Sequence, residues 1–200
     1  MSTVITPACS LSPPLIPRLL TAADLACLPS ELPSGPVRYE LDNGRLVIMP
    51  PPGDIHGAVE NNIAADLKVQ GERRGHGKAR SGEVAIILRR NPDRVVGADA
   101  AFITNASLPI RRSREGYLET IPELVSEILS KNDTQLEIDQ KIQDYLMAGV
   151  KVVWVADPAT QTVKEYRPGL PPRVYAITDT LTIDDIIPGF KMTVRQVFEI

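Results

Sequence analysis

The sequence predicts a mixed α/β domain in which helices pack on a central β-sheet. Short segments with strand-like patterns are separated by two longer segments in which apolar residues recur with a helical period. Turn residues mark most of the borders, and strands and helices alternate along the chain, which is typical of helices that cover a shared sheet. Two hundred residues suffice for one such domain with a proper core.

The first half of the chain begins with a proline-rich segment. We expect residues 1–20 to be a flexible lead-in without a signal helix, and residues 21–200 to form a single domain. A short helix is predicted at 21–29, where Thr21 caps it and a proline stops it. The dipeptide Asn43-Gly44 between "VRYEL" and "RLVIMP" then predicts a tight β-hairpin.

Further elements follow in regular order. A helix is expected from about residue 55 to 73, then a basic glycine-punctuated loop at 71–82, and then strands at 83–88 and 94–104. The segment 123–129 is the next strand. The elements after it are a helix that Thr134 and Glu137 begin as a capping box and Gly149 ends, buried strand 150–158, its partner 162–168, edge strands, and a short terminal helix.

Composition excludes several classes of protein. With 43% hydrophobic and 24% charged residues and no apolar run of membrane-spanning length, the chain reads as a soluble protein with no membrane partner. Its two cysteines, Cys9 and Cys27, lack metal-ligand spacing and indicate a reducing cytoplasm. A net charge of -3 excludes binding of nucleic acid through overall charge, although local basic patches remain possible.

Glu127 is the unusual residue of the strand at 123–129. Side chains alternate along a strand, so Glu127 shares a face with Val125 and Leu129, both core-type residues. An ionised carboxylate removed from water without a partner costs several kcal/mol. We therefore expect a cation, a donor or a metal ion next to Glu127.

A second acid has the same setting. Alternation places Asp99 on one face with Val95, Gly97, Ala101 and Ile103, among small neighbours that leave room for a ligand. An ordinary buried aspartate satisfied by backbone donors is the alternative for either acid alone.

Lys141 is the cation that the pattern favours for these acids. It lies beside the apolar stripe of the helix after Thr134, next to Ile138 and Tyr145, and that helix directly follows the strand of Glu127. Folding back would bring its ammonium group near both carboxylates, although a lysine stem can also reach solvent. Two carboxylates and a lysine suit Mg²⁺-dependent phosphodiester hydrolysis, and the metal would offset the cost of burying the acids.

Several motifs together carry a family resemblance. "YELDNGRLVIM", a histidine at 56 that opens a helix, "GADAAFI", "ELVSEILS", "KIQDYLMAGVKVVWVADP" and "IPGFKMTVRQVF" resemble the Uma-type putative restriction endonuclease family, a bacterial branch of the PD-(D/E)XK nuclease superfamily. The similarity runs from about residue 21 to the end and rests on order and spacing across most of the chain.

The resemblance implies an α/β fold with a restriction-endonuclease-like core, a mixed sheet flanked by helices. It implies metal ligation by Asp99, Glu127 and Ile128, with Mg²⁺ or Mn²⁺ as the ion, and catalytic roles for Glu40, Asp99, Glu127 and Lys141. Lys141 would replace a lysine that the superfamily usually carries on the strand. The chain departs from the pattern at Ala98, at Leu129 and in "SKND", where Lys131 is a second candidate for the cation.

Two further candidates are open on the residues alone. Glu40 alternates with its neighbours in a way that fits either the site or an exposed hairpin position, and His56 at a helix start is more often a cap or surface residue than a base. Basic loops around the proposed strands suit phosphate contacts with duplex or branched DNA. They contain Arg73, Arg74, His76, Lys78, Arg80, Arg89, Arg90, Arg94, Arg111, Arg112 and Arg114.

These observations predict a metal-dependent DNA endonuclease, which we expect to be a homodimer because paired cuts need two sites and twofold symmetry is the commonest assembly. The alternative is a catalytically degenerate nuclease-fold protein that acts as a DNA-binding or regulatory module, favoured by Leu129 and "SKND". A structural oligomer without a nucleic-acid role is a third possibility.

Overall fold

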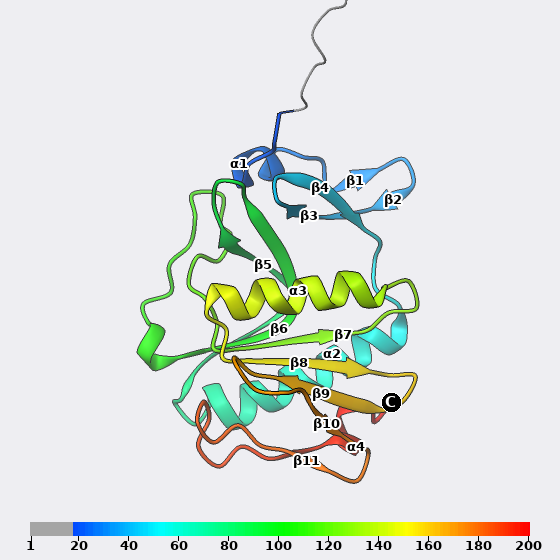
Figure 1. Cartoon of the computed structure of the whole chain (residues 1–200), viewed down its shortest axis with the longest axis vertical. Helices are drawn as coiled ribbons and strands as arrows, with labels where there is room; N and C mark the ends of the chain where they lie inside the picture. Colours follow the sequence, from blue (N-terminus) through cyan, green and yellow to red (C-terminus); the bar gives the residue numbers. More distant parts are fainter. Residues whose placement is uncertain (1–17) are drawn as a thin grey trace, which may run out of the picture.

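A computed structural model describes residues 18–200, so that nearly all of the predicted lead-in 1–20 lies outside the described residues. The described chain is built around a mixed sheet of eight strands in the order β10-β9-β8-β7-β6-β3-β4, with β5 paired to β6 as well (Figure 1). The pair β7–β8 is parallel and the other pairs are antiparallel. The strands are β3 (Arg38–Asp42), β4 (Arg45–Met49), β5 (Gly77–Arg89), β6 (Arg94–Thr104), β7 (Leu124–Ile128), β8 (Val152–Asp157), β9 (Thr162–Tyr166) and β10 (Arg173–Tyr175).

Helices cover both faces of this sheet, as the sequence predicted. The remaining elements are α1 (Ala22–Ala26), α2 (Asp54–Asp66) with its π-helical continuation η1 (Leu67–Glu72), the 3-10 turn η2 (Asn105–Ser107), α3 (Gln135–Ala148), α4 (Val194–Val197), and the short pairs β1 (Glu31–Leu32) with β2 (Gly35–Pro36) and β11 (Thr180–Leu181) with β12 (Met192–Thr193). In Figure 1, α3 crosses in front of the sheet and α2 lies behind it. One core therefore joins α3 to the sheet, and another joins α2 and the C-terminal segment to the opposite face.

Local signals in the sequence set several boundaries correctly. Asn43 and Gly44 adopt positive φ angles of 51° and 75°, which the tight turn between β3 and β4 requires. Thr134 and Glu137 form the predicted capping box of α3, and Gly149 ends that helix with a φ of 108°.

The loop expected at 71–82 is wrong in its second half. Strand β5 begins at Gly77, which pairs with Thr104 of β6. A Cβ atom at Gly77 would lie only 2.1 Å from the carbonyl oxygen of Ile103, so this glycine permits a close approach of two strands. The helix expected over 55–73 also changes character, because its last turns, from Leu67, are π-helical.

Strict alternation along β6 is wrong as well. Val96 and Ala98 belong to the same core as Ala101 and Ile103, although Ala98 and Ala101 are three positions apart and strict alternation would put them on opposite faces. The cause is an irregularity in β5: Ala98 pairs with Val84 and Ala100 with Ser81, so two residues of β5 stand opposite Asp99 alone. Asp99 therefore lies where the alternation of the strand is interrupted. Its side chain can point to the other face of the sheet from Ala101 and Ile103.

Candidate active site and metal centre

Glu127 has two donors within the chain. The Lys141 ammonium nitrogen lies 2.8 Å from Glu127 Oε2, and the Tyr145 hydroxyl donates to Glu127 Oε1 over 2.6 Å. Both donors come from α3, one turn apart, because Lys141 and Tyr145 are four residues apart on one helix face. The compensating cation that the sequence predicted is present. The role of Tyr145 was not predicted, because its place on the apolar stripe of the helix indicates only a core residue.

Lys141 gathers the acids of two strands. Besides Glu127 in β7, it contacts Glu40 Oε1 in β3 at 3.1 Å and donates to the carbonyl oxygen of Gly97 in β6 over 2.9 Å. Its side chain is 14% exposed, so the alternative of a lysine that reaches into solvent is wrong. Glu40 is only 7% exposed, and its Oε1 also accepts the Gly97 N–H, so the exposed hairpin position considered for it is wrong too.

The charges in this cluster shift the pKa values of both Glu127 and Lys141. Burial raises the pKa of Glu127 to about 7, with a further contribution from Asp99, although Lys141 opposes the change. Burial by itself would lower the pKa of Lys141, but the carboxylates of Glu127 and Glu40 outweigh that effect and raise it. The pKa values of Glu127 and Lys141 can both rise because several acids share a single ammonium group, so the cluster retains its protons.

Asp99 points toward α2. Its Oδ2 accepts the N–H of Ile128 over 2.7 Å and lies 3.4 Å from Nε2 of His56. Gly53 is the N-cap residue of α2, so His56 is not the cap, and its side chain is only 13% exposed. Burial lowers the pKa of His56, but the hydrogen bond and charge of Asp99, with Glu60 and Glu127, raise it overall. The prediction that His56 is a helix cap or a surface residue is therefore wrong.

A possible metal centre lies on this side of Asp99. His56, Glu60 and Asp99 each offer a ligand atom, and these atoms lie within 4.8 Å of one another. One imidazole nitrogen and two carboxylate oxygens are a chemically suitable set for a divalent cation. Within residues 18–200, Nδ1 of His56 is buried without a hydrogen-bond partner. Glu60 was not among the residues predicted from the sequence; the signal was its spacing of four residues from His56, which places both on one face of a helix.

The predicted ligands Asp99, Glu127 and Ile128 are thus adjacent but differently engaged. Asp99 contacts the backbone of Ile128 and His56, whereas both carboxylate oxygens of Glu127 accept hydrogen bonds from α3. Among the described residues, the ligand atoms that come together are those of His56, Glu60 and Asp99, whereas a site between Asp99 and Glu127 stays a prediction.

The basic residues divide into two groups. Arg94 is wrong as a loop residue for phosphate contacts, because it is buried in β6, where it donates to Asp144 Oδ2 over 2.7 Å. Lys131 is exposed on the loop after β7. The exposed members of the predicted basic loops are Arg73, Arg74, Lys78, Arg90, Arg111, Arg112 and Arg114.

This fold and this cluster of acids around a lysine define a restriction-endonuclease-like protein. A family model described as "Uma2: Putative restriction endonuclease" matches residues 24–195, and the chain belongs to that family. The match supports a nuclease-type hydrolase acting on nucleic acid, and confirms the resemblance seen in the sequence.

A solved structure supports the fold independently. The crystal structure of a putative nuclease belonging to DUF820 from Anabaena variabilis ATCC 29413 has a TM-score of 0.71 and 19% sequence identity, and the alignment covers 88% of this chain and 96% of that chain. At this identity the likeness establishes the fold. Curated proteins provided no significant sequence match. Across residues 18–200, no helix combines the length and apolar character needed to cross a membrane.

Proposed function

We propose that this protein is a metal-dependent endonuclease that hydrolyses phosphodiester bonds in duplex or branched DNA. The observation that carries the proposal is the contact of Lys141 with Glu40 and Glu127, beside Asp99, in a chain of a nuclease family. Acids on two strands contact one ammonium group, and Asp99 lies beside them on the strand between, so that together they would provide the charges that phosphoryl transfer needs.

The proposed cation is Mg²⁺ or Mn²⁺, held by Asp99 together with either His56 and Glu60 or Glu127 and Ile128. When bound, such an ion polarises a phosphoryl oxygen and lowers the pKa of a coordinated water. The ligand set with His56 would favour Mn²⁺ over Mg²⁺, because an imidazole nitrogen is a softer ligand than oxygen.

The chain itself supplies positioning and charge. Lys141 carries a positive charge at neutral pH, so it would orient the attacking water and stabilise negative charge on the phosphoryl group. Glu40 holds the Lys141 ammonium group from one side, and Tyr145 fixes the carboxylate of Glu127. Exposed arginines on the loops would contact DNA phosphates, which gives affinity without sequence preference.

Nicking of a supercoiled plasmid tests the proposal. Wild-type protein with Mn²⁺ or Mg²⁺ is expected to nick the plasmid, and Glu127→Gln, which keeps the shape of the side chain, is expected to lose at least 100-fold of this activity. Arg195→Gln in α4 is the matched surface control and should retain it. Equal nicking by wild type and Glu127→Gln would contradict the assignment, since a contaminating nuclease would explain both.

A catalytically degenerate DNA-binding protein is the second candidate. It is favoured by Leu129, which stands where the superfamily usually has lysine and packs against the α3 core. Calorimetry separates the two candidates: a protein that binds DNA but neither Mg²⁺ nor Mn²⁺ would be the degenerate form.

The proposal includes a homodimer and action in the cytoplasm. Strand β4 ends the described sheet, and its Leu46, Val47 and Ile48 are exposed, with Ile48 54% exposed. Antiparallel pairing of β4 with a second copy would centre on Val47 and place Leu46 opposite Ile48 of the partner, so that apolar side chains on both faces meet. Because β3 with Glu40 lies next to β4, the two sites would flank the dyad.

A further inference from the structure

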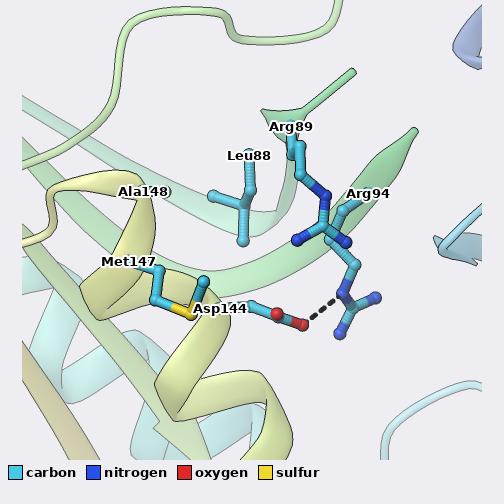
Figure 2. Close-up of a pocket in the computed structure, with 6 residues that line it drawn as sticks. All are labelled: Leu88, Arg89, Arg94, Asp144, Met147 and Ala148. Atoms are coloured by element: carbon cyan, nitrogen blue, oxygen red, sulfur yellow. Dashed lines mark hydrogen bonds and ion pairs between the residues drawn. The ribbon is translucent and has the colours of Figure 1, made fainter. Parts of the chain in front are cut away.

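A second buried ion pair adjoins the site. Asp144 on α3 and Arg94 on β6 are both buried, and Arg94 Nε donates to Asp144 Oδ2 over 2.7 Å. Figure 2 shows this contact between the helix and the strand. Asp144 lies three residues after Lys141, so the same helix face presents both to the sheet.

Arg94 reaches from Asp144 to Glu40. Its Nη1 donates to the carbonyl oxygen of Leu41 over 3.1 Å and lies 3.5 Å from Glu40 Oε2. The other oxygen of Glu40, Oε1, accepts the Gly97 N–H over 2.9 Å and contacts Lys141 at 3.1 Å. The Glu40 carboxylate is therefore held between two cations, with one oxygen turned toward each.

Packing alone does not account for this pair. A buried ion pair is weak evidence for stability, because apolar residues of similar size often stabilise as well or better. Arg94 and Asp144 also border a hollow of about 140 Å³, which Leu88, Arg89, Met147 and Ala148 complete (Figure 2). The pair thus lies where close packing is interrupted, and its contacts lead toward Glu40.

We propose that Arg94 and Asp144 are positioning residues of the active site, which hold Glu40 and, through it, the Lys141 ammonium group in the orientation that cleavage needs. Asp144 balances the guanidinium charge and fixes its plane, and Gln140 in turn donates to Asp144 Oδ1 over 3.2 Å. Without Arg94, the carboxylate of Glu40 loses its second cation and its fixed orientation. This inference rests on the proposed nuclease function.

A double-mutant cycle tests the link between Arg94 and Glu40. We expect Arg94→Met to lower kcat for plasmid nicking at least tenfold, with KM for DNA changed less than twofold, because neither residue is exposed to bind DNA. Arg94→Met combined with Glu40→Gln should be no slower than the slower single variant, since both changes remove the same function. A double variant whose loss of kcat equals the product of the two single losses would overturn the proposal. So would a wild-type kcat for Arg94→Met.

A second readout needs no cleavage. Acetylation of lysines by acetic anhydride, followed by mass spectrometry, should label Lys141 at least tenfold more slowly than exposed Lys131 in wild-type protein. Arg94→Met should raise the labelling of Lys141 at least threefold. Equal labelling in both proteins would overturn the positioning role, even if the wild type proves inactive and the nuclease proposal itself fails.

Two variants separate positioning from general loss of structure. Arg167→Met removes another arginine that bridges two acids, Glu165 and Asp185. Arg167 directly follows β9, which is four strands away from β3 and Glu40 in the sheet. This variant should leave kcat and Lys141 labelling unchanged. If Arg94→Met does not fold, Asp144→Asn takes its place in both experiments, because it keeps the volume and an acceptor for Arg94; its expected losses have the same direction, and wild-type values in both would overturn the proposal.

Discussion

Lys141 and Glu127 lie 14 residues apart in the chain, in two different layers, yet their charged atoms are 2.8 Å apart. The contact joins α3 to β7, the strand that immediately precedes it. It explains how a carboxylate is tolerated in a core: its charge meets an ammonium group, and its second oxygen meets the Tyr145 hydroxyl. The same ammonium group also contacts Glu40, as the proposed hydrolysis of a phosphodiester requires.

Removal of the Lys141 ammonium group should destabilise the protein in a pH-dependent way. Lys141→Met leaves the buried Glu127 without its ammonium partner and leaves Glu40 with Arg94 as its one cation, so we expect a loss of about 3–5 kcal/mol in the free energy of unfolding at pH 8. The loss should shrink at pH 5, because Glu127, whose pKa is raised to about 7, then binds a proton. Urea denaturation at both pH values, with a chelator present, measures it. Met147→Lys on the exposed side of α3 is the control, and an equal loss for Lys141→Met at both pH values would contradict the prediction.

Glu127 should also make the wild type less stable as pH rises through neutrality. Its folded pKa, about 7, is above its ordinary value of 4.5, so the folded state binds this proton more tightly than the unfolded state. The contribution is fully present below about pH 4.5, and it is lost as pH rises toward 7. Denaturation of wild type and Glu127→Gln in metal-free buffer should show that the variant lacks this part of the pH profile; parallel profiles would contradict it.

The metal ligands can be distinguished by calorimetry. We expect His56→Ala to weaken Mn²⁺ binding at least tenfold and to affect Mg²⁺ less, because the lost ligand is an imidazole nitrogen. Glu60→Gln should weaken the binding of both Mn²⁺ and Mg²⁺. If Glu127→Gln weakens binding and His56→Ala does not, the cation lies between Asp99 and Glu127, as the sequence resemblance implied.

Salt dependence should separate surface arginines from the buried one. Arg111→Ala and Arg112→Ala each remove an exposed charge, so each should reduce the slope of log affinity against log salt by about 1 if it contacts a phosphate. Arg94→Met should leave the slope unchanged because Arg94 is buried. DNA binding measured by fluorescence anisotropy at several salt concentrations gives these slopes, and an unchanged slope for both surface variants would remove these two arginines from the interface.

The outer edge of β4 should mediate dimerisation. Ile48→Lys places a charge in the proposed pairing strand, so we expect it to convert a dimer into a monomer without loss of folding, since Ile48 is already 54% exposed. Light scattering coupled to size-exclusion chromatography measures the mass. Val174→Lys on β10, the opposite edge strand, is the matched control. A monomeric wild type, or a dimer that survives Ile48→Lys, would contradict the prediction.

Local signals in the sequence determined much of this protein by themselves. The Asn43-Gly44 turn, the capping box at Thr134 and the glycine that ends α3 depend on neighbouring residues only, and each is formed as predicted. The pairing of Glu127 with Lys141 was also within reach, because alternation in a strand and the helical period determine which way each side chain points.

Only the tertiary structure decided the rest. The break of register opposite Asp99 turns that acid toward His56 and Glu60, and it depends on how β5 pairs with β6, which the pattern within one strand does not contain. From the sequence, Arg94 was grouped with the exposed loop arginines. Its burial was not predictable there, because its partners Glu40 and Asp144 are 54 and 50 residues away in the chain. Periodicity predicts which face a residue occupies, whereas contacts between distant segments determine what it meets there.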